Sequence, residues 1–406
     1  MRMSKKKELV PKLRFSEFYN SKWKVTKLGK IAVEVNERAG DDTYLLMSVT
    51  SGVGLVLQVE KFGREIAGDS YKNYIVIRKY DFAYNKSATK QFPEGYLCML
   101  SEYDAAAIPK SIFTCFRIID SECYPDFLDY LFHNNYHGRW LRKYIEVGAR
   151  AHGSLSIDTK YLWMMPIAMP CLREQQKIAD CLASVDVLIR AETGKLELLK
   201  KYKKGLMQKL FPVQGKTVPE WRFPEFRDCG EWETSKAGNV LHTIIPSKKI
   251  AKSEYKSVGS YPIIDQSREY ISGWTDDEKA LNRSKLPLII FGDHTCILKF
   301  VDQPFAQGAD GIKIFAAERN VDAQFLYYCL ENLPINSDGY KRHYSALKEQ
   351  TVMFPDEASG EQQKIADCLS ETDMLIKAQS DKVEALKLHK RGLMQGLFPS
   401  SAEVDE

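Results

Sequence analysis

The chain contains one long segment twice. Residues 174–212 read EQQKIADCLASVDVLIRAETGKLELLKKYKKGLMQKLFP, and residues 361–399, which begin 187 positions later, are identical to them at 25 of 39 positions. Repetition at a fixed offset is typical of a chain whose structural unit was duplicated. The sequence before each copy shows no such identity. We therefore expect two halves of common construction whose variable parts do different work.

Each copy has the hydrophobic periodicity of a coiled-coil helix. Apolar residues recur at alternating spacings of four and three, and no proline interrupts either copy before its final Phe-Pro. A continuous helix of this length would span about 55 Å at roughly 1.5 Å per residue. We expect the two stripes to pair the helices through Ile178, Leu182, Val185, Ile189, Leu196, Leu199, Leu206 and Leu210 in the first copy, and Ile365, Leu369, Ile376, Val383, Leu386, Leu393 and Leu397 in the second.

Polar residues recur in this seam at matching positions. Glu192 and Lys203 in the first copy correspond to Gln379 and Lys390 in the second. Polar residues inside a coiled coil fix its register at some cost in stability. Our register hypothesis is an antiparallel pairing that places Glu192 opposite Lys390 and Lys203 opposite Gln379. A purely structural interpretation, a coiled coil that only holds the two halves together, is compatible with a functional one.

A shorter repeat opens each half. Residues 10–18 (VPKLRFSEF) correspond to residues 218–226 (VPEWRFPEF), and each segment is followed by a tryptophan, Trp23 or Trp232. A short linker with Gly215 separates the first long repeat from the second opening, since glycine and proline interrupt regular structure. We expect a first variable domain at 1–172, a first helix at 173–214, a second variable domain at 215–358, a second helix at 359–400 and a tail at 401–406.

Each variable domain has strand patterns first and helix patterns late. Residues 44–58, 74–77, 82–84 and 111–119 are rich in β-branched and aromatic residues, and helical patterns follow at 125–136 and 137–145. The second half predicts strands at 261–264, 286–291, 296–301 and 311–315, then a helix at 323–333. The fold class expected for both halves is α+β.

Composition and motifs exclude several classes of protein. The 58 basic and 54 acidic residues leave a net charge of only +4, so any nucleic-acid interface must be argued locally. The nine cysteines and seven histidines show no metal-ligand spacing, and we expect neither a disulfide framework nor a bound metal. Because no apolar run of about 18 residues occurs, we expect a soluble cytoplasmic protein without a membrane partner.

Motifs for catalysis are also missing. The sequence has no N/D-P-P-Y/F methyltransferase tetrad and no G-x-x-x-x-G-K-S/T phosphate loop, and Gly52-Val-Gly54 lacks the remaining glycine of a dinucleotide fingerprint. The run Asp276-Asp277-Glu278-Lys279 is superficially similar to a nuclease E-x-K element, but no matching acidic residue precedes it. We expect a solvated loop there.

Taken together, these residues resemble the specificity subunits of type I restriction-modification systems. The resemblance rests on the paired P-x-x-R-F-x-x-F…W openings and on the E-Q-Q-K-I-A-x-x-L helix starts, of which the first follows the apolar, proline-containing segment 165–170. It also rests on the G-L-M-Q-x-L-F-P ends at 205–212 and 392–399, and it spans nearly the whole chain.

The resemblance implies an α+β chain with two target-recognition domains separated by two long helices, which form an antiparallel coiled-coil spacer in a pseudo-twofold repeat. Each domain would read one half of an asymmetric bipartite target in double-stranded DNA. The helices would set the spacing and dock two methyltransferase subunits, and restriction/translocase subunits would join the full complex. The chain itself would carry no catalytic residue, with S-adenosylmethionine, ATP and Mg on partner subunits.

Two other functions stand beside this one. An enzyme in its own right, a fused methyltransferase or nuclease, is disfavoured by the missing motifs. A coiled-coil scaffold that no longer reads DNA, or a silent copy of a specificity subunit, would keep the helices and lose the readers.

Polar loops with small or basic residues are the expected places of DNA contact, since they offer donors and acceptors to base edges and charge to phosphates. For each residue the alternative is a hairpin turn or a solvated surface charge. The candidates in the first domain are Lys86, Lys90, Arg150, His152 and Ser154. Those in the second domain are Gln266, Arg268, His294, Thr295, Gln307, Lys313, Lys341, Arg342 and His343.

Overall fold

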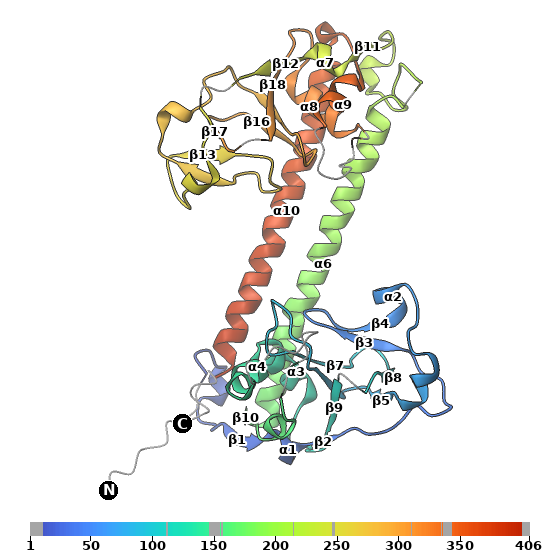
Figure 1. Ribbon diagram of the computed structural model, residues 1–406, viewed down its shortest axis with the longest axis vertical. Helices are drawn as coiled ribbons and strands as arrows, with labels where there is room; N and C mark the ends of the chain where they lie inside the picture. The colour runs from blue at the N-terminus through green and yellow to red at the C-terminus, as the bar shows by residue number, and fades with distance from the viewer. Residues whose placement is uncertain are drawn as a thin grey trace. The chain divides into compact units, whose positions relative to one another are not determined.

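The computed structural model divides the chain into two compact units. Unit 1 comprises Met1–Ala191 and Lys382–Glu406, and unit 2 comprises Glu192–Asp381. The structure describes residues 11–110, 113–145, 155, 157–213, 215–245, 248–309, 311–333, 335 and 343–399. Each unit therefore contains a part of both long helices, α6 (Leu172–Leu210) and α10 (Glu361–Leu397), labelled in Figure 1. Among the helices of these residues, none is long and apolar enough to cross a membrane.

A four-stranded antiparallel sheet forms the centre of unit 1. Its order is β2 (Ala32–Glu34), β9 (Phe113–Ile118), β6 (Phe82–Asn85) and β7 (Tyr96–Met99). Successive residues face opposite sides, so Phe82 packs in the core that contains α3 (Pro125–His133) and Ala83 packs in the core on the other face. Because both faces are covered there, β6 and β7 are buried along their whole length.

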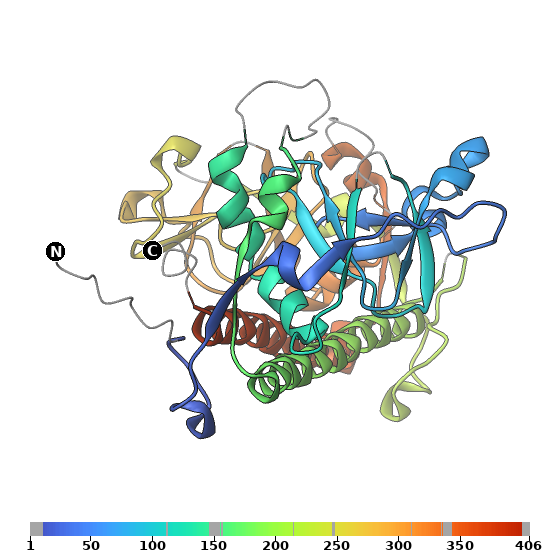
Figure 2. The same ribbon diagram turned by 90° about the horizontal axis from the view of Figure 1, so that it is seen from below.

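The remaining elements of unit 1 cover this sheet. Figures 1 and 2 show β4 and α2 on one side of the unit and α4 on the other. They comprise the hairpin β3 (Met47–Thr50) and β4 (Gly54–Leu57), α2 (Gln58–Phe62), the pair β5 (Ile75–Arg78) and β8 (Ala105–Ile108), α1 (Leu28–Ile31), α4 (Tyr136–Leu141) and α5 (Lys160–Trp163).

Unit 2 repeats the central sheet with other residues. Its order is β12 (Leu241–Ile244), β18 (Ile312–Ala317), β15 (Leu288–Gly292) and β16 (Leu298–Val301), again antiparallel, so β15 takes the place that β6 has in unit 1. One face packs against α8 (Ala323–Glu331), as the corresponding face in unit 1 packs against α3. A second sheet is peculiar to this unit and consists of β14 (Gly273–Thr275), β13 (Tyr261–Ile264) and β17 (Ala306–Gln307).

The beginning and the end of each variable domain pair directly. In unit 1, β1 (Lys24–Lys27) follows the opening motif and pairs antiparallel with β10 (Pro166–Met169), which leads into α6. In unit 2, β11 (Glu233–Lys236) pairs in the same way with β19 (Thr351–Phe354), shortly before α10. The repeated segments of the sequence are therefore neighbours in space within each unit.

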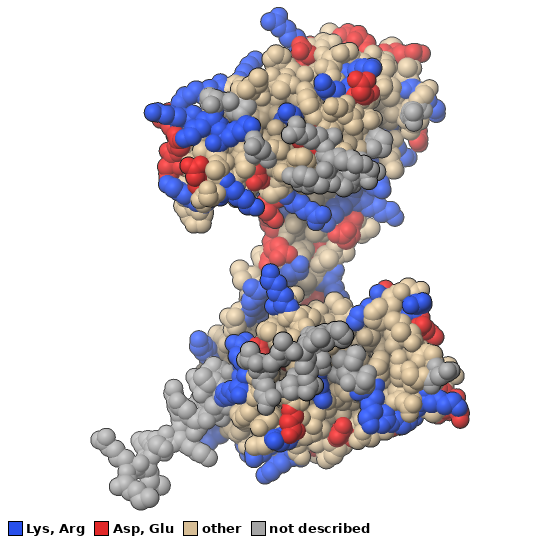
Figure 3. All heavy atoms as spheres, in the orientation of Figure 1, with Lys and Arg blue, Asp and Glu red and all other residues tan. Residues whose placement is uncertain are grey.

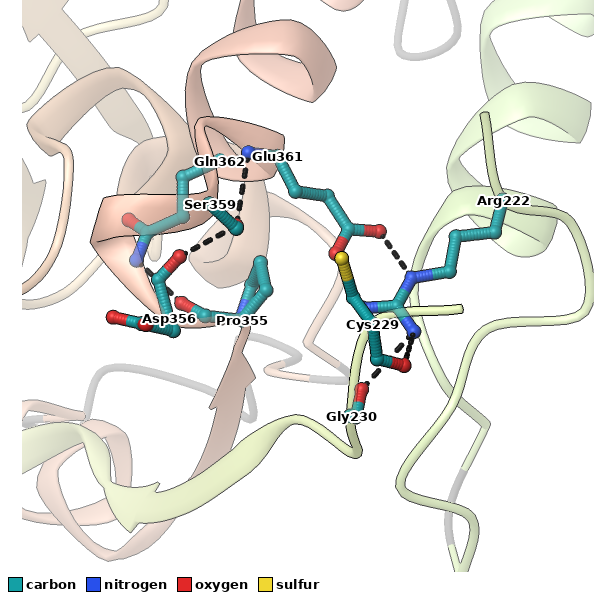
Figure 4. A network of polar contacts seen from close by, with 8 residues as sticks. All are labelled: Arg222, Cys229, Gly230, Pro355, Asp356, Ser359, Glu361 and Gln362. Carbon is teal, nitrogen blue, oxygen red and sulfur yellow. Dashed lines mark hydrogen bonds and ion pairs between the residues drawn. The ribbon is translucent and has the colours of Figure 1, made fainter. Parts of the chain in front are cut away.

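A buried ion pair reinforces this closure. The Arg14 guanidinium donates Nε and Nη2 to the two carboxylate oxygens of Glu174, each over 2.8 Å, and the two side chains are 5% and 0% exposed. In unit 2, Arg222 Nε donates to Glu361 over 2.7 Å, and Nη1 donates to the carbonyls of Cys229 and Gly230 (Figure 4). Hydrogen bonding to Glu361 raises the pKa of the Arg222 guanidinium, although burial opposes this shift.

The glutamine after each of these glutamates holds the turn that starts a domain helix. Gln175 accepts from the Tyr124 N–H and donates to the Glu122 and Pro170 carbonyls, just before α3. Gln362 makes the corresponding contacts before α8, accepting from the Asp322 N–H and donating to the Asn320 and Pro355 carbonyls. The E-Q-Q motif thus fastens each variable domain to the helix that follows it.

Within each unit the two long helices run antiparallel. Ile178 and Leu182 share a core with Met394 and Leu397 in unit 1. Met207 and Leu210 share one with Ile365 and Leu369 in unit 2. None of the fifteen apolar residues expected in the helix seam is exposed: eight are buried and seven are half-buried.

The antiparallel direction of our register hypothesis is confirmed, but the contacts expected for the polar seam residues were wrong. Gln379 Nε2 donates to Glu192 Oε2 over 2.6 Å, and Lys390 pairs with Asp186 over 2.6 Å. Lys203 pairs with Asp373 over 2.9 Å instead of meeting Gln379. The apolar clusters in the two units set the register, and Lys203 also pairs with Glu331 of α8 over 2.8 Å.

Each of these lysines also contacts a domain helix. In unit 1, the Tyr130 hydroxyl of α3 donates to Asp186 over 2.9 Å, and Lys390 Nζ lies 5.2 Å from the centre of the Tyr130 ring. In unit 2, Tyr328 of α8 donates to Asp373 over 2.9 Å, with Lys203 Nζ 5.1 Å from its ring. Burial raises the pKa of both tyrosines, and the neighbouring aspartate acts in the same direction.

The structure confirms the expected α+β class, both long helices and the strands and helices predicted in each half. The predicted strand at 44–58 is a hairpin with Thr50 and Gly54 at its turn, followed by the short helix α2. Sequence patterns predicted β13 of the second sheet in unit 2, but they did not predict the strands β1, β2, β7, β8, β10, β11, β12, β14, β17 and β19. These elements are short, and most gain their pairing partners from distant parts of the chain.

The first prediction concerns the ion pair of unit 2. Replacing Arg222 with Met should lower the free energy of unfolding by about 3–5 kcal/mol, because the Glu361 carboxylate would remain buried without its partner. Urea unfolding at neutral pH followed by circular dichroism measures this loss. The double variant Arg222→Met/Glu361→Met should recover most of it, since neither charge is then left in the interior.

A matched control is Lys364, which lies on α10, the helix that carries Glu361. Lys364 pairs with Glu225 over 3.6 Å with both side chains about half exposed, so Lys364→Met should change the stability by less than about 1 kcal/mol. An Arg222→Met variant no less stable than this control would show that the ion pair does not close the unit.

Candidate nucleic-acid interface

The two units place corresponding backbone contacts at the end of the central strand. After β6 in unit 1, the Lys86 carbonyl accepts a hydrogen bond from the Leu155 N–H over 2.9 Å. After β15 in unit 2, the Asp293 carbonyl accepts from the His343 N–H, also over 2.9 Å. In each unit a polar loop after the strand thus meets the segment that leads towards the long helix, and these two edges gather several of the predicted DNA-contact residues.

In unit 1 the edge is a loop closed by its own polar groups. Asn85 Oδ1 accepts from the Ser87 N–H over 2.9 Å, and the Thr89 hydroxyl accepts from the Phe92 N–H over 3.0 Å. Lys86 is half-buried, and burial lowers the pKa of its ammonium while Glu34 and Asp158 oppose this shift. Lys90 is exposed and lines a hollow beside the loop.

In unit 2 two glycines let a glutamine approach the strand end. A Cβ at Gly292 would lie 2.2 Å from the Thr295 hydroxyl, and a Cβ at Gly311, whose φ is +102°, would lie 2.6 Å from Gln266 Nε2. The Thr295 hydroxyl donates to the Gln266 carbonyl over 2.9 Å. The predicted residues Gln266 and Thr295 therefore lie together. The space that the two glycines leave open is occupied by the Gln266 side chain and not by a ligand.

A buried lysine organises the loop that carries Gln266 and Arg268. Lys299, only 5% exposed, donates to the carbonyls of Asp265, Glu269 and Tyr270. Burial lowers the pKa of its ammonium, while Asp265 and Glu269 act in the opposite direction. This lysine fixes the loop from behind and leaves Arg268 exposed, on the rim of a second hollow of about 370 Å³.

Tyr344 joins other predicted residues, although sequence reasoning did not single it out. Its N–H donates to Asp293 Oδ1 over 2.8 Å, and its ring is 5.2 Å from Lys313 Nζ. The preceding residue, His343, is 7% exposed, and its Nε2 has no hydrogen-bond partner among the described residues. Lys313 and His343 are thus held at the same edge as Asp293.

Gln307 departs from its predicted role. It lies in β17 with 2% exposure, and its carbonyl accepts from the Ile250 N–H. Its side chain is buried, and its Oε1 has no hydrogen-bond partner among the described residues. His294 is half-buried beside Thr295. Arg150, His152, Ser154, Lys341 and Arg342 lie outside the described residues.

The acidic run at 276–278, expected to be a solvated loop, neutralises nearby cations. Asp276 pairs with Lys256 over 2.8 Å, Asp277 with Lys248, and Glu278 with Arg283 over 3.1 Å. Figure 3 shows cationic side chains gathered over the part of unit 2 that carries β13 and β17, interspersed with acidic ones. Much of this positive charge is therefore compensated within the unit and is a weak indicator of a DNA contact.

Comparisons with known proteins agree with this architecture. Residues 230–387 match the profile of the type I restriction modification DNA specificity domain. The putative type I restriction enzyme MjaX specificity subunit of Methanocaldococcus jannaschii is 27% identical over 280 residues, which is 64% of this chain and 64% of that relative. The MjaVIII specificity subunit of the same organism is 27% identical over 300 residues, covering 64% of this chain and 68% of the relative.

The fold has a solved counterpart. The crystal structure of the S subunit of a type I restriction-modification system from M. genitalium superposes with a TM-score of 0.63 over 96% of this chain and 99% of that one, at 14% identity. The same duplicated frame thus forms from a very different sequence. In its repeated motifs and in its fold, this chain is similar to the specificity subunits of type I restriction-modification systems.

Proposed function

We propose that this chain is the DNA sequence-recognition subunit of a type I restriction-modification complex. Each unit reads one half of an asymmetric bipartite target, and the long helices set the distance between the half-sites. The observation that carries the proposal is the pair of corresponding strand ends. Unit 1 presents Asn85 and Lys86 there, and unit 2 presents Asp293 and His294. One frame with two different sets of side chains suits the recognition of two different half-sites.

The long helices offer matching apolar surfaces to partner subunits. Val187 and Leu188 of α6 are 57% and 43% exposed, and the residues at the same repeat positions of α10, Met374 and Leu375, are 64% and 58% exposed. Exposed apolar side chains that recur at equal positions indicate a docking surface made twice. We assign these two surfaces to two copies of the methyltransferase subunit.

Catalysis then belongs to the partners. S-adenosylmethionine binds to the methyltransferase subunits, and ATP and Mg²⁺ bind to the restriction/translocase subunits that join the complex. The task of this chain is to hold the two recognition edges and the partner surfaces in place, and we assign no catalytic residue to it.

The target itself can be read from the genome of the source cell. Deleting the gene should remove methylation from a single asymmetric two-part motif, because the methyltransferase subunits would lose their guide to that sequence. Single-molecule sequencing of modified bases in the strain with and without the gene measures this. An unchanged map would favour a silent copy or a scaffold.

Docking can be tested on the helix surfaces. Leu188→Glu and Leu375→Glu should each reduce copurification of the methyltransferase subunit by roughly tenfold or more, because a buried carboxylate at the interface would lack a partner. The stability of the isolated chain should stay near that of the wild type, since both positions are exposed.

The matched controls are Gln208→Glu and Gln395→Glu, which add the same charge at exposed polar positions of the same two helices. Equal copurification of the leucine variants and these controls would place the docking surface elsewhere.

A further inference from the structure

A hollow of about 640 Å³ opens beside the recognition edge of unit 1. Its walls are the end of β3, the helix α2 and the loop that follows β6. The lining consists of hydroxyl, amide, lysine and phenylalanine side chains with one valine, and it includes no carboxylate. Positive charge, neutral hydrogen-bonding groups and aromatic rings together match the chemistry of a nucleotide.

The position of α2 is fixed by a buried glutamine. Gln58, 2% exposed, accepts from the Ile66 N–H over 3.0 Å, and its backbone N–H donates to the Leu46 carbonyl over 2.8 Å. On the facing wall, Gly52 with φ +84° brings the hairpin turn onto Phe92, so that a Cβ there would lie 3.0 Å from the ring. The hollow is therefore held by defined contacts on two sides.

Lys61 brings an uncompensated charge to this hollow. Its ammonium donates to the Val49 carbonyl over 2.9 Å and lies 3.4 Å from the Ser48 hydroxyl, both neutral oxygens. Among the described residues no carboxylate pairs with it, and burial lowers its pKa. A lysine ammonium has three donors, so one donor and the full charge remain for an anion.

Asn85 offers a hydrogen-bond donor with a fixed direction. Its side chain is 7% exposed and lines the hollow. Because Oδ1 accepts from the Ser87 N–H, the other end of the amide must be Nδ2, which has no partner among the described residues. An amide held in this way donates to acceptors on a base edge, such as purine N7, guanine O6 or thymine O4.

An aromatic ring completes the lining on the α2 side. Phe62 is 45% exposed, and Lys61 Nζ lies 5.1 Å from the centre of its ring. An exposed ring beside a cation stacks well against a base or a sugar next to a phosphate.

We propose that this hollow receives one nucleotide of the half-site read by unit 1, with its phosphate against Lys61 and a base-edge acceptor against Asn85 Nδ2. This inference rests on the function proposed above and adds Asn85 to the specificity-determining residues of the chain and Lys61 to its phosphate-binding residues. The corresponding edge of unit 2 is filled by Gln266 and Thr295, so the two units read their half-sites by different means.

The test uses two variants in the chromosomal gene. Asn85→Asp keeps an acceptor for the Ser87 N–H and replaces the donor with a carboxylate. Methylation should fall roughly tenfold at the native motif and change its preference at one base pair of one half-site, while the other half-site is unchanged. Single-molecule maps of modified bases report both effects.

Lys61→Met should act on all target sequences alike, because a phosphate contact carries no sequence information. DNA binding by the purified complex should weaken, and the slope of log K against log salt should decrease in magnitude by about one. The control Lys30→Met removes an exposed charge from α1 of the same unit and should reproduce the wild-type slope and map.

The outcomes distinguish a failure of the proposed function from a failure of the inference about the hollow. If deleting the gene leaves the methylation map unchanged, the proposed function itself fails. If deletion removes a motif while both variants keep the wild-type map and salt slope, the hollow does not bind DNA. A variant that loses methylation together with thermal stability also counts against the inference, since its side chain then serves the fold.

Discussion

A guanidinium and a carboxylate meet away from water in each unit, Arg14 with Glu174 and Arg222 with Glu361. The arginine belongs to the opening motif and the glutamate to the first turn of a long helix, so the pair ties the beginning of a variable domain to its end. Neither partner can be lost alone without leaving a buried charge. The strand pairs β1–β10 and β11–β19 act at the same place. The interior of each domain can therefore change while the helix attachment stays the same.

Hydrophobic periodicity predicted the helices well because it depends on local spacing alone. The face it predicted is the face that the structure buries or half-buries. The same periodicity could not predict the partners of the polar seam residues. The partners of Lys203 and Lys390 include tyrosines of α8 and α3, and these helices are not part of the heptad pattern. The repeat in the sequence nevertheless signalled the result: Asp186 and Asp373 occupy equal positions in the two copies, and so do the two lysines.

The edges after β6 and β15 show which features cannot be predicted from the amino-acid sequence. Polar turns predicted Gln266 and Thr295 in one cluster, and the structure brings them together. The same reasoning placed Gln307 in a turn, where the structure has a buried strand whose pairing with β13 is set far away in the chain. Lys61 was missed because it follows a hairpin and carries no motif. Only the fold brings it to the hollow that Asn85 lines.

The two edges differ in the space that lies beside the central strand. In unit 2 the space beside the central strand is occupied by Gln266, which packs against glycines, while in unit 1 the corresponding region is hollow. A filled edge presents groups at its surface, whereas a hollow admits part of the ligand and surrounds it. Since the strand end is anchored by the same backbone hydrogen bond in both units, these differences arise from side chains and short inserted elements such as α2. A duplicated frame can therefore diverge in the surface that it presents without any change in how it is built.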